Sequence, residues 1–144
     1  MTPLIRAATG SDSDAIRALL EAAGLPTADL RDSWPTFWVA AAGTELIGTG
    51  ALEIHAETAL LRSLAVAPAW RGGGLGHRLV KALERQARAA GLHQIVVLTE
   101  TAEAFFTGLG YEVIARAQAP QAVRASPEFA ALCPQSATCL RKTL

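Results

Sequence analysis

The spacing of apolar residues predicts that the chain alternates between strands and helices. Residues 4–7 form a short apolar run, and apolar residues at helical spacing follow over residues 11–23, after polar side chains suited to an N-cap. Gly24 and Pro26 end this helix. Residues 27–32 fit either a second, short helix or a loop.

The next segment has the pattern of a hairpin followed by a buried strand. Residues 37–42 and 45–54 read as two strands around the turn residues Gly43 and Thr44. Residues 58–66 are almost all apolar, which is typical of a central strand, and Pro68 ends that run.

The second half continues the alternation. It predicts a helix over 75–91, a strand over 94–98, a helix from 100 or 101 to 110, strands over 111–115 and 137–140, and a helical insert over 119–132. Mixed order of this kind predicts an α/β fold, and the length of 144 residues predicts one domain, 1–144.

Composition and charge favour an enzyme that acts on a small molecule. Apolar residues make up 51% of the chain and the formal charge is zero, so no overall field attracts nucleic acid or an acidic membrane. We find no basic leader ahead of an apolar run and expect a cytoplasmic protein. Cys133 and Cys139 lack metal-site spacing, so we expect reduced thiols and no bound metal.

A glycine cluster after the central strand has the character of an anion site. Residues 71–76 read Arg-Gly-Gly-Gly-Leu-Gly and open a helix. Glycines permit close backbone approach, and the free amides of a first helical turn favour phosphate. The spelling matches neither Gly-x-x-x-x-Gly-Lys-Ser/Thr nor Gly-x-Gly-x-x-Gly. Lys81, Arg85 and Arg88 add positive charge, either for a polyanionic cofactor or as a solvated helix face.

Two motifs resemble the GNAT N-acetyltransferases. The first is Arg71-x-x-Gly74-x-Gly76 after Leu-Ala-Val-x-Pro, which is similar to the acetyl-coenzyme A signature of that family. The second is residues 104–111, Ala-Phe-Phe-x-x-Leu-Gly-Tyr. The resemblance implies a GNAT fold, with a mixed, mostly antiparallel central sheet flanked by helices.

A closer likeness is carried by residues 61–66 and 128–134, which read Leu-Arg-Ser-Leu-Ala-Val and Glu-Phe-x-x-Leu-Cys-Pro. Both resemble the small acetyltransferases related to N-acetylglutamate synthase, including those found with bacterial arsenic-resistance genes. This likeness implies acetyl transfer to a small anionic amine such as an amino acid, an arsenic-containing analogue or another toxic amine.

The resemblance also implies how acetyl-coenzyme A is held as co-substrate. The backbone of Leu64, Ala65 and Val66, on a bulged strand that splays from its neighbour, pairs with the pantetheine arm and the acetyl oxygen. The pyrophosphate lies on the amides of Arg71, Gly72, Gly73, Gly74, Leu75, Gly76 and His77.

The catalytic side chains of the family are missing at their usual places. Leu60 stands where many members carry a glutamate base, and Phe106 stands where a tyrosine often protonates the thiolate. Tyr111 is close in sequence, where the resemblance implies a packing residue, and a catalytic role as a substitute acid is the alternative. Glu53 and His55 share a strand face, and we take Glu53 as the first choice of base and His55 as the second. Catalysis by alignment alone is the remaining alternative.

The acceptor site has three candidates. Arg62 is a charge within an apolar strand, which predicts either a pair with an acceptor carboxylate or an internal ion pair with Glu53 or Glu57. Trp34 and Trp38, with Phe37 between them, fit an acceptor pocket or the core.

Several alternatives stay open beyond the acceptor. A homodimer is not decided by the sequence. The other functions are a non-catalytic module that binds coenzyme A and a thiol-based arsenic-binding protein that uses Cys133 and Cys139.

Overall fold

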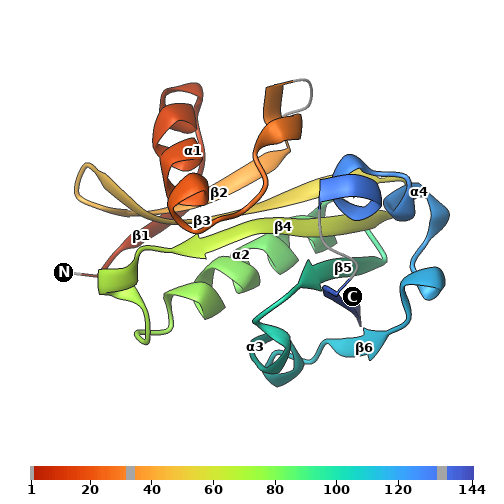
Figure 1. The fold of residues 1–144 in the computed structure, drawn as a ribbon. Coiled ribbons are helices and arrows are strands. Elements are labelled where there is room, and N and C mark those ends of the chain that lie inside the picture. The colour runs from red at the N-terminus through yellow and green to blue at the C-terminus, as the bar shows by residue number, and fades with distance from the viewer. Residues whose placement is uncertain (1, 32–34, 133–135) are drawn as a thin grey trace.

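The computed structural model describes residues 2–31, 35–132 and 136–144, and these residues contain one mixed sheet (Figure 1). Its strands are β1 (Leu4–Ala7), β2 (Thr36–Ala42), β3 (Glu45–His55), β4 (Thr58–Val66), β5 (Gln94–Thr99), β6 (Glu112–Ile114) and β7 (Thr138–Thr143). They are ordered β1-β2-β3-β4-β5-β7-β6. The β4–β5 pair is parallel and the other described pairs are antiparallel, which confirms the expected GNAT sheet.

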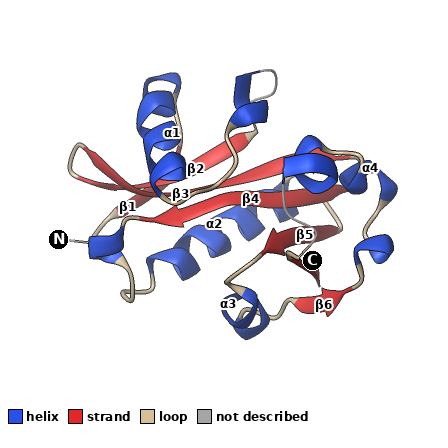
Figure 2. Ribbon diagram, in the orientation of Figure 1, coloured by secondary structure: helices blue, strands red, loops and turns tan. Residues whose placement is uncertain are grey.

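Helices cover both faces of the sheet (Figures 1 and 2). The α-helices are α1 (Ser13–Ala22), α2 (Leu75–Ala89), α3 (Glu103–Gly108) and α4 (Gln121–Arg124). The shorter turns are η1 (Gly10–Asp12), η2 (Ala28–Arg31), η3 (Pro68–Trp70), η4 (Arg116–Gln118) and the π-type turn η5 (Glu128–Leu132). Helices α2 and α3 pack on one face, and α1 and α4 pack on the other. In the described part of the chain, no helix has the length and apolar character needed to cross a membrane.

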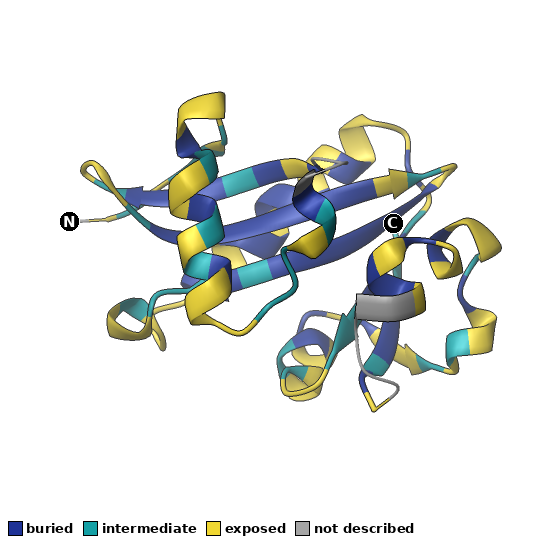
Figure 3. Cartoon of the chain, turned by 45° about the horizontal axis from the view of Figure 1, so that its top comes forward, coloured by how far each residue is buried: buried dark blue, intermediate teal, exposed yellow. Residues whose placement is uncertain are grey.

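The core lies in the two layers between the sheet and its helices (Figure 3). On the α2 face, Leu61 packs with Leu83 and Phe106. Helix α2 approaches β3 closely, because a Cβ added to Gly50 would lie 2.9 Å from Leu83 Cδ1. On the opposite face, α1 contributes Ile16 to a separate cluster. The strands between the layers are therefore buried on both sides.

Strand β4 carries a bulge at the centre of the sheet. Thr49 lies opposite Ala65 and Ala51 lies opposite Arg62, so two residues of β4 face one residue of β3. Ser63 takes φ +58°, a left-handed conformation that is uncommon outside glycine. The parallel pairing with β5 ends at Leu61 and Val97, and the two strands separate beyond that point.

Most of the predicted elements are confirmed, including the hairpin at residues 43–44 and the α/β class. Residues 27–32 contain a short helix, η2. The predicted helical insert over 119–132 is present but is divided into two parts. The segment forms α4 and then η5, because Pro127 disfavours helical backbone at the residue before it and interrupts the turn between them.

Candidate active site

A cavity of about 390 Å³ opens where β4 and β5 separate. Its wall includes β4 residues 61–64, β5 residues 97–99 and the turn after α1 at residues 23–26. Phe106 and Glu128 complete it from α3 and η5. The bulged segment of β4 is therefore exposed to a cavity at the place where it has lost β5 as a pairing partner.

The glycine turn lies on the surface directly after β4. Gly72 and Gly74 have φ near +80°, and Gly74 is the N-cap of α2 without a side-chain hydrogen bond to the helix. The first-turn amides of α2 have no intrahelical acceptor and can receive an anion. Arg71 Nε donates to the Val66 carbonyl at 3.0 Å, which ties the turn to the end of β4.

The predicted cofactor residues thus form one continuous path from the cavity to the surface. Leu64 lines the cavity, Ala65 is buried, and Val66 leads into the turn. Gly76 is needed for packing, since a Cβ there would lie 3.3 Å from the Phe105 ring. His77 stacks edge-on against the same ring, with 5.3 Å between the ring centroids.

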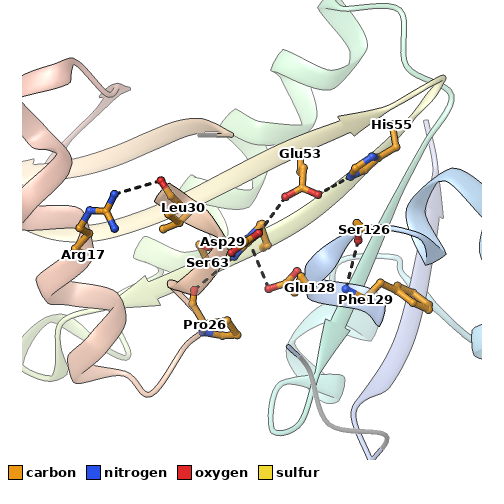
Figure 4. Close-up of polar contacts among 11 residues, drawn as sticks. Arg17, Pro26, Asp29, Leu30, Glu53, His55, Ser63, Ser126, Glu128 and Phe129 are labelled. Atoms are coloured by element: carbon orange, nitrogen blue, oxygen red, sulfur yellow. Dashed lines mark hydrogen bonds and ion pairs between the residues drawn. The ribbon is translucent and has the colours of Figure 1, made fainter. Parts of the chain in front are cut away.

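Arg62 lies at the centre of a buried ionic cluster. Figure 4 shows the three carboxylates of this cluster, those of Asp29, Glu53 and Glu128, close to one another. Its Nη1 donates to Asp29 and, at 3.0 Å, to Glu53 Oε2. Its Nη2 donates to Asp29 Oδ1 at 2.9 Å and to the Pro26 carbonyl at 3.4 Å. Its Nε donates to Ser63 Oγ at 3.2 Å. All five N–H groups of the guanidinium therefore have acceptors.

The cluster joins segments that are distant in the sequence. Asp29 comes from η2, Glu53 from β3 and Glu128 from η5, and the Glu128 Oε1 lies 3.7 Å from Arg62 Nε. Burial alone would lower the pKa of Arg62, but the hydrogen bonds and charges of the carboxylates raise it. Among the described residues, three carboxylates therefore share one fully buried cation.

Glu128 has a strongly perturbed acidity. Burial raises the pKa of Glu128 to about 7, against the opposing effect of Arg62 and with smaller contributions from Glu53 and Asp29. A carboxyl that titrates near neutrality in a cavity wall is a candidate for proton transfer.

A second cavity of about 330 Å³ also borders the cluster. It is lined by Asp29, Glu53 and His55, among others. His55 Nε2 and Glu53 Oε1 are 2.6 Å apart, so the two predicted base candidates are in contact. Glu57 does not join them, because β3 ends at His55 and Glu57 turns outward to pair with His93.

The sequence left open whether Arg62 pairs with an acceptor carboxylate or forms an internal ion pair, and the structure shows an internal ion pair. It contains the internal ion pair with Glu53 that was one alternative, and Asp29 and Glu128 are partners that the sequence analysis missed. Those two residues are 33 and 66 positions from Arg62, so no local spacing identifies them. The only signal in the sequence was the family likeness of residues 128–134, which include Glu128, and that likeness assigned no function to Glu128.

The remaining predicted residues fall outside the cavity walls or outside the described chain. Trp38 packs against the core of the α2 face, and Phe37 is buried beside α1. Trp34 and Cys133 lie outside the described residues. Cys139 is buried in β7, where burial raises its thiol pKa.

The family's usual catalytic positions hold groups that transfer no proton in the cavity. Leu60 is fully buried under α4 and η5, and Phe106 lines the cavity with an apolar ring. Tyr111 is buried and donates to Glu84 at 3.0 Å, and burial raises its pKa.

Comparison with known proteins identifies the family. The family model described as "Acetyltransferase (GNAT) domain" matches residues 33–113. The chain belongs to the GNAT acetyltransferases. Of the charged residues in the cluster, Glu53 and Arg62 lie within this match, and Asp29 and Glu128 lie outside it.

Individual relatives agree with this GNAT assignment. An amino-acid acetyltransferase of Mycobacterium tuberculosis is 34% identical over 122 residues, which cover 78% of this chain and 70% of that relative. A Mycobacterium tuberculosis protein crystallised with CoA is 26% identical, with a TM-score of 0.83 over 99% of both chains. These relatives confirm the predicted enzyme class, an N-acetyltransferase with acetyl-CoA as co-substrate.

A larger enzyme shares the fold. The N-acetylglutamate synthase of Neisseria gonorrhoeae, crystallised with coenzyme A and N-acetyl-glutamate, has a TM-score of 0.84 at 24% identity. The match covers all of this chain but only 35% of that enzyme. This GNAT chain therefore spans about a third of the synthase's length.

Proposed function

We propose that this enzyme transfers the acetyl group of acetyl-CoA to the amino group of a small amino acid or analogue. The observation that carries the proposal is the opening between β4 and β5 beside the bulge at Ser63. Backbone groups released there are suited to hold the pantetheine arm and the acetyl oxygen, as donors preorganised for a developing oxyanion. The 34% identity to an amino-acid acetyltransferase supports the class of acceptor.

The cofactor would run from this opening to the glycine turn. Leu64 and Val66 lie along that path, and the amides after Gly72 and Gly74 would receive the pyrophosphate. Arg78, in the first turn of α2, would add to the attraction.

Arg62 is better suited to positioning than to holding the acceptor. An acceptor carboxylate would have to displace Asp29 or Glu53 from a guanidinium whose N–H groups are all occupied. We propose that Arg62 holds the carboxylates of η2, β3 and η5 in place, and that direct binding of the acceptor by Arg62 is the alternative.

A turnover assay tests the activity. Release of coenzyme A thiol from acetyl-CoA is measured with a panel of acidic, neutral and basic amino acids, an arsenic-containing amino acid and simple amines, and products are identified by mass. Acetylated product from an amino acid is the expected result. Binding of CoA without turnover on any amine would favour a non-catalytic module instead.

A matched pair of variants tests the cofactor path. Gly74 and Gly91 both have positive φ and open space around the Cα, but they lie at opposite ends of α2. Gly74→Glu should reduce CoA affinity at least a hundredfold, because it adds a carboxylate beside the pyrophosphate. Gly91→Glu should show the same backbone strain and normal CoA affinity by calorimetry. Equal affinities in both variants would contradict the path.

A further inference from the structure

The carboxylates around Arg62 differ in how they are engaged. Asp29 uses both oxygens on the guanidinium, and Glu53 uses one oxygen on Arg62 and the other on His55. Glu128 has only the 3.7 Å ion pair with Arg62 Nε, and no hydrogen bond to its carboxylate is found within the described parts of the chain. Its lone pairs are therefore available to another donor.

The carboxylates also face different cavities. Asp29 and Glu53 line the smaller cavity, whose lining residues include His55 and none from β4 or β5. Glu128 lines the cavity that contains Ser63 and Leu64, where the thioester would lie under the proposed function. Glu100 is the other carboxylate that we find in that wall, and it is exposed at the end of β5.

The turn that carries Glu128 is held firmly. Ser126 Oγ accepts from the Phe129 amide at 3.3 Å, and the Ser126 carbonyl accepts from the Ala130 amide at 2.8 Å. Phe129 packs into the cluster that contains Leu60. Glu128 itself is only 5% exposed, so its carboxylate has a fixed place in the wall.

We propose that Glu128 receives the proton of the acceptor ammonium, an inference that rests on the proposed acetyl transfer. The neutral amine then attacks the thioester carbonyl, so that the C–N bond forms and the C–S bond breaks. A second proton of the nitrogen ends on the thiolate sulfur, giving the coenzyme A thiol. Glu128 returns its proton to water, and one proton is released per turnover.

The surroundings of Glu128 suit this role. The titratable and charged groups that face it are Arg62 from β4, Asp29 from η2 and Glu53 from β3. The two carboxylates and burial disfavour its ionised form, while Arg62 keeps that form accessible. The group can therefore alternate between both states near neutral pH.

The role of Glu53 changes accordingly. With both oxygens engaged and its place in the other cavity wall, Glu53 acts as a positioning residue for Arg62. The sequence-based expectation of a Glu53 base is thus replaced by a base from η5, a segment outside the family match.

The test compares Glu128→Gln with Glu112→Gln. Glu112 is an exposed carboxylate on β6 that also pairs with an arginine, Arg141, at 2.9 Å. At pH 7, Glu128→Gln should lower kcat about a hundredfold while the Kd for CoA stays unchanged, and Glu112→Gln should match the wild type. Activity of Glu128→Gln should recover as the pH approaches the pKa of the acceptor amine.

Further variants separate a loss of the base from a loss of the fold and from a base elsewhere in the wall. If Glu128→Gln does not fold, Glu128→Asp keeps the charge, and a fall in kcat with unchanged CoA affinity would support the role. A wild-type rate and pH profile in folded Glu128→Gln would overturn it. A similar loss in Glu100→Gln, with none in Glu128→Gln, would assign the base to Glu100. A wild-type enzyme that acetylates no amine would instead overturn the proposed function.

Discussion

Two buried ionic clusters lie on opposite faces of the sheet and differ in their balance of charge. The cluster around Arg62 has one cation for three carboxylates and borders both cavities. The cluster around Glu84 on α2 has one carboxylate, which receives hydrogen bonds from Lys142 at 3.1 Å and Tyr111 at 3.0 Å. Neither Glu84 nor its two donors line either of these two cavities.

The contrast indicates that the cluster around Glu84 is structural and that the cluster around Arg62 is suited to proton transfer. Around Glu84, the donors outnumber the carboxylate, since Lys81 Nζ also lies 3.5 Å from Glu84 Oε1. Around Arg62, carboxylates are in excess, and the Glu128 carboxylate accepts no hydrogen bond in the described structure. An excess of one charge next to a cavity is where protonation states can change during a reaction.

Removing the central cation should have the largest effect. Arg62→Met leaves three carboxylates together without a partner, and we expect a loss of about 3–5 kcal/mol in the free energy of unfolding. Lys142→Met leaves Glu84 with Tyr111 and Lys81, and should cost about 2 kcal/mol. Urea unfolding of both variants gives the comparison. Equal losses would show that the two clusters are equivalent, and a stable Arg62→Met enzyme with a raised acceptor KM alone would assign Arg62 to acceptor binding.

The pH dependence of stability should distinguish the clusters next. The pKa of Glu128 is raised to about 7, so its folded state binds a proton more tightly than the unfolded chain does. Its contribution to stability is complete below the unfolded pKa and is lost as the pH rises through 7. Between pH 5 and 8 the wild type should lose about 2 kcal/mol relative to Glu128→Gln. Parallel stability curves for the two proteins would contradict the raised pKa.

Tyr111→Phe should have the smallest effect. It removes one donor from Glu84 and keeps the ring packed against Phe106, so we expect a loss of about 1 kcal/mol and an unchanged kcat. Thermal unfolding and steady-state kinetics check the two parts separately. A fall in kcat at constant stability would restore Tyr111 as a candidate acid.

The sequence was sufficient for the elements and for the geometry of the glycine turn because both depend on local patterns. Apolar periodicity located the strands, and the positive φ of Gly72 and Gly74 is what the glycine cluster predicts. The residues on the acceptor side of the site were harder to predict from the sequence. Asp29 and Glu128 reach Arg62 only through tertiary folding. The alternation of side chains along a strand places Glu53 and His55 on one face, but it does not show that the two side chains hydrogen-bond to each other.

The bulge in β4 also shows how the pairing of this strand with β3 depends on a single residue, Ser63. Leaving Ser63 out would pair Arg62, Leu64, Ala65 and Val66 with four consecutive residues of β3, from Ala51 back to Gly48, with every side chain on its present face. Strand β4 is therefore a regular strand with one residue inserted. Ser63 accepts a hydrogen bond from Arg62 but belongs to none of the apolar clusters, so what the insertion maintains besides that bond is the local break in backbone pairing. A Ser63 deletion would accordingly keep the apolar clusters, remove one acceptor from Arg62, and leave an ordinary, fully paired strand at the place where the thioester would bind.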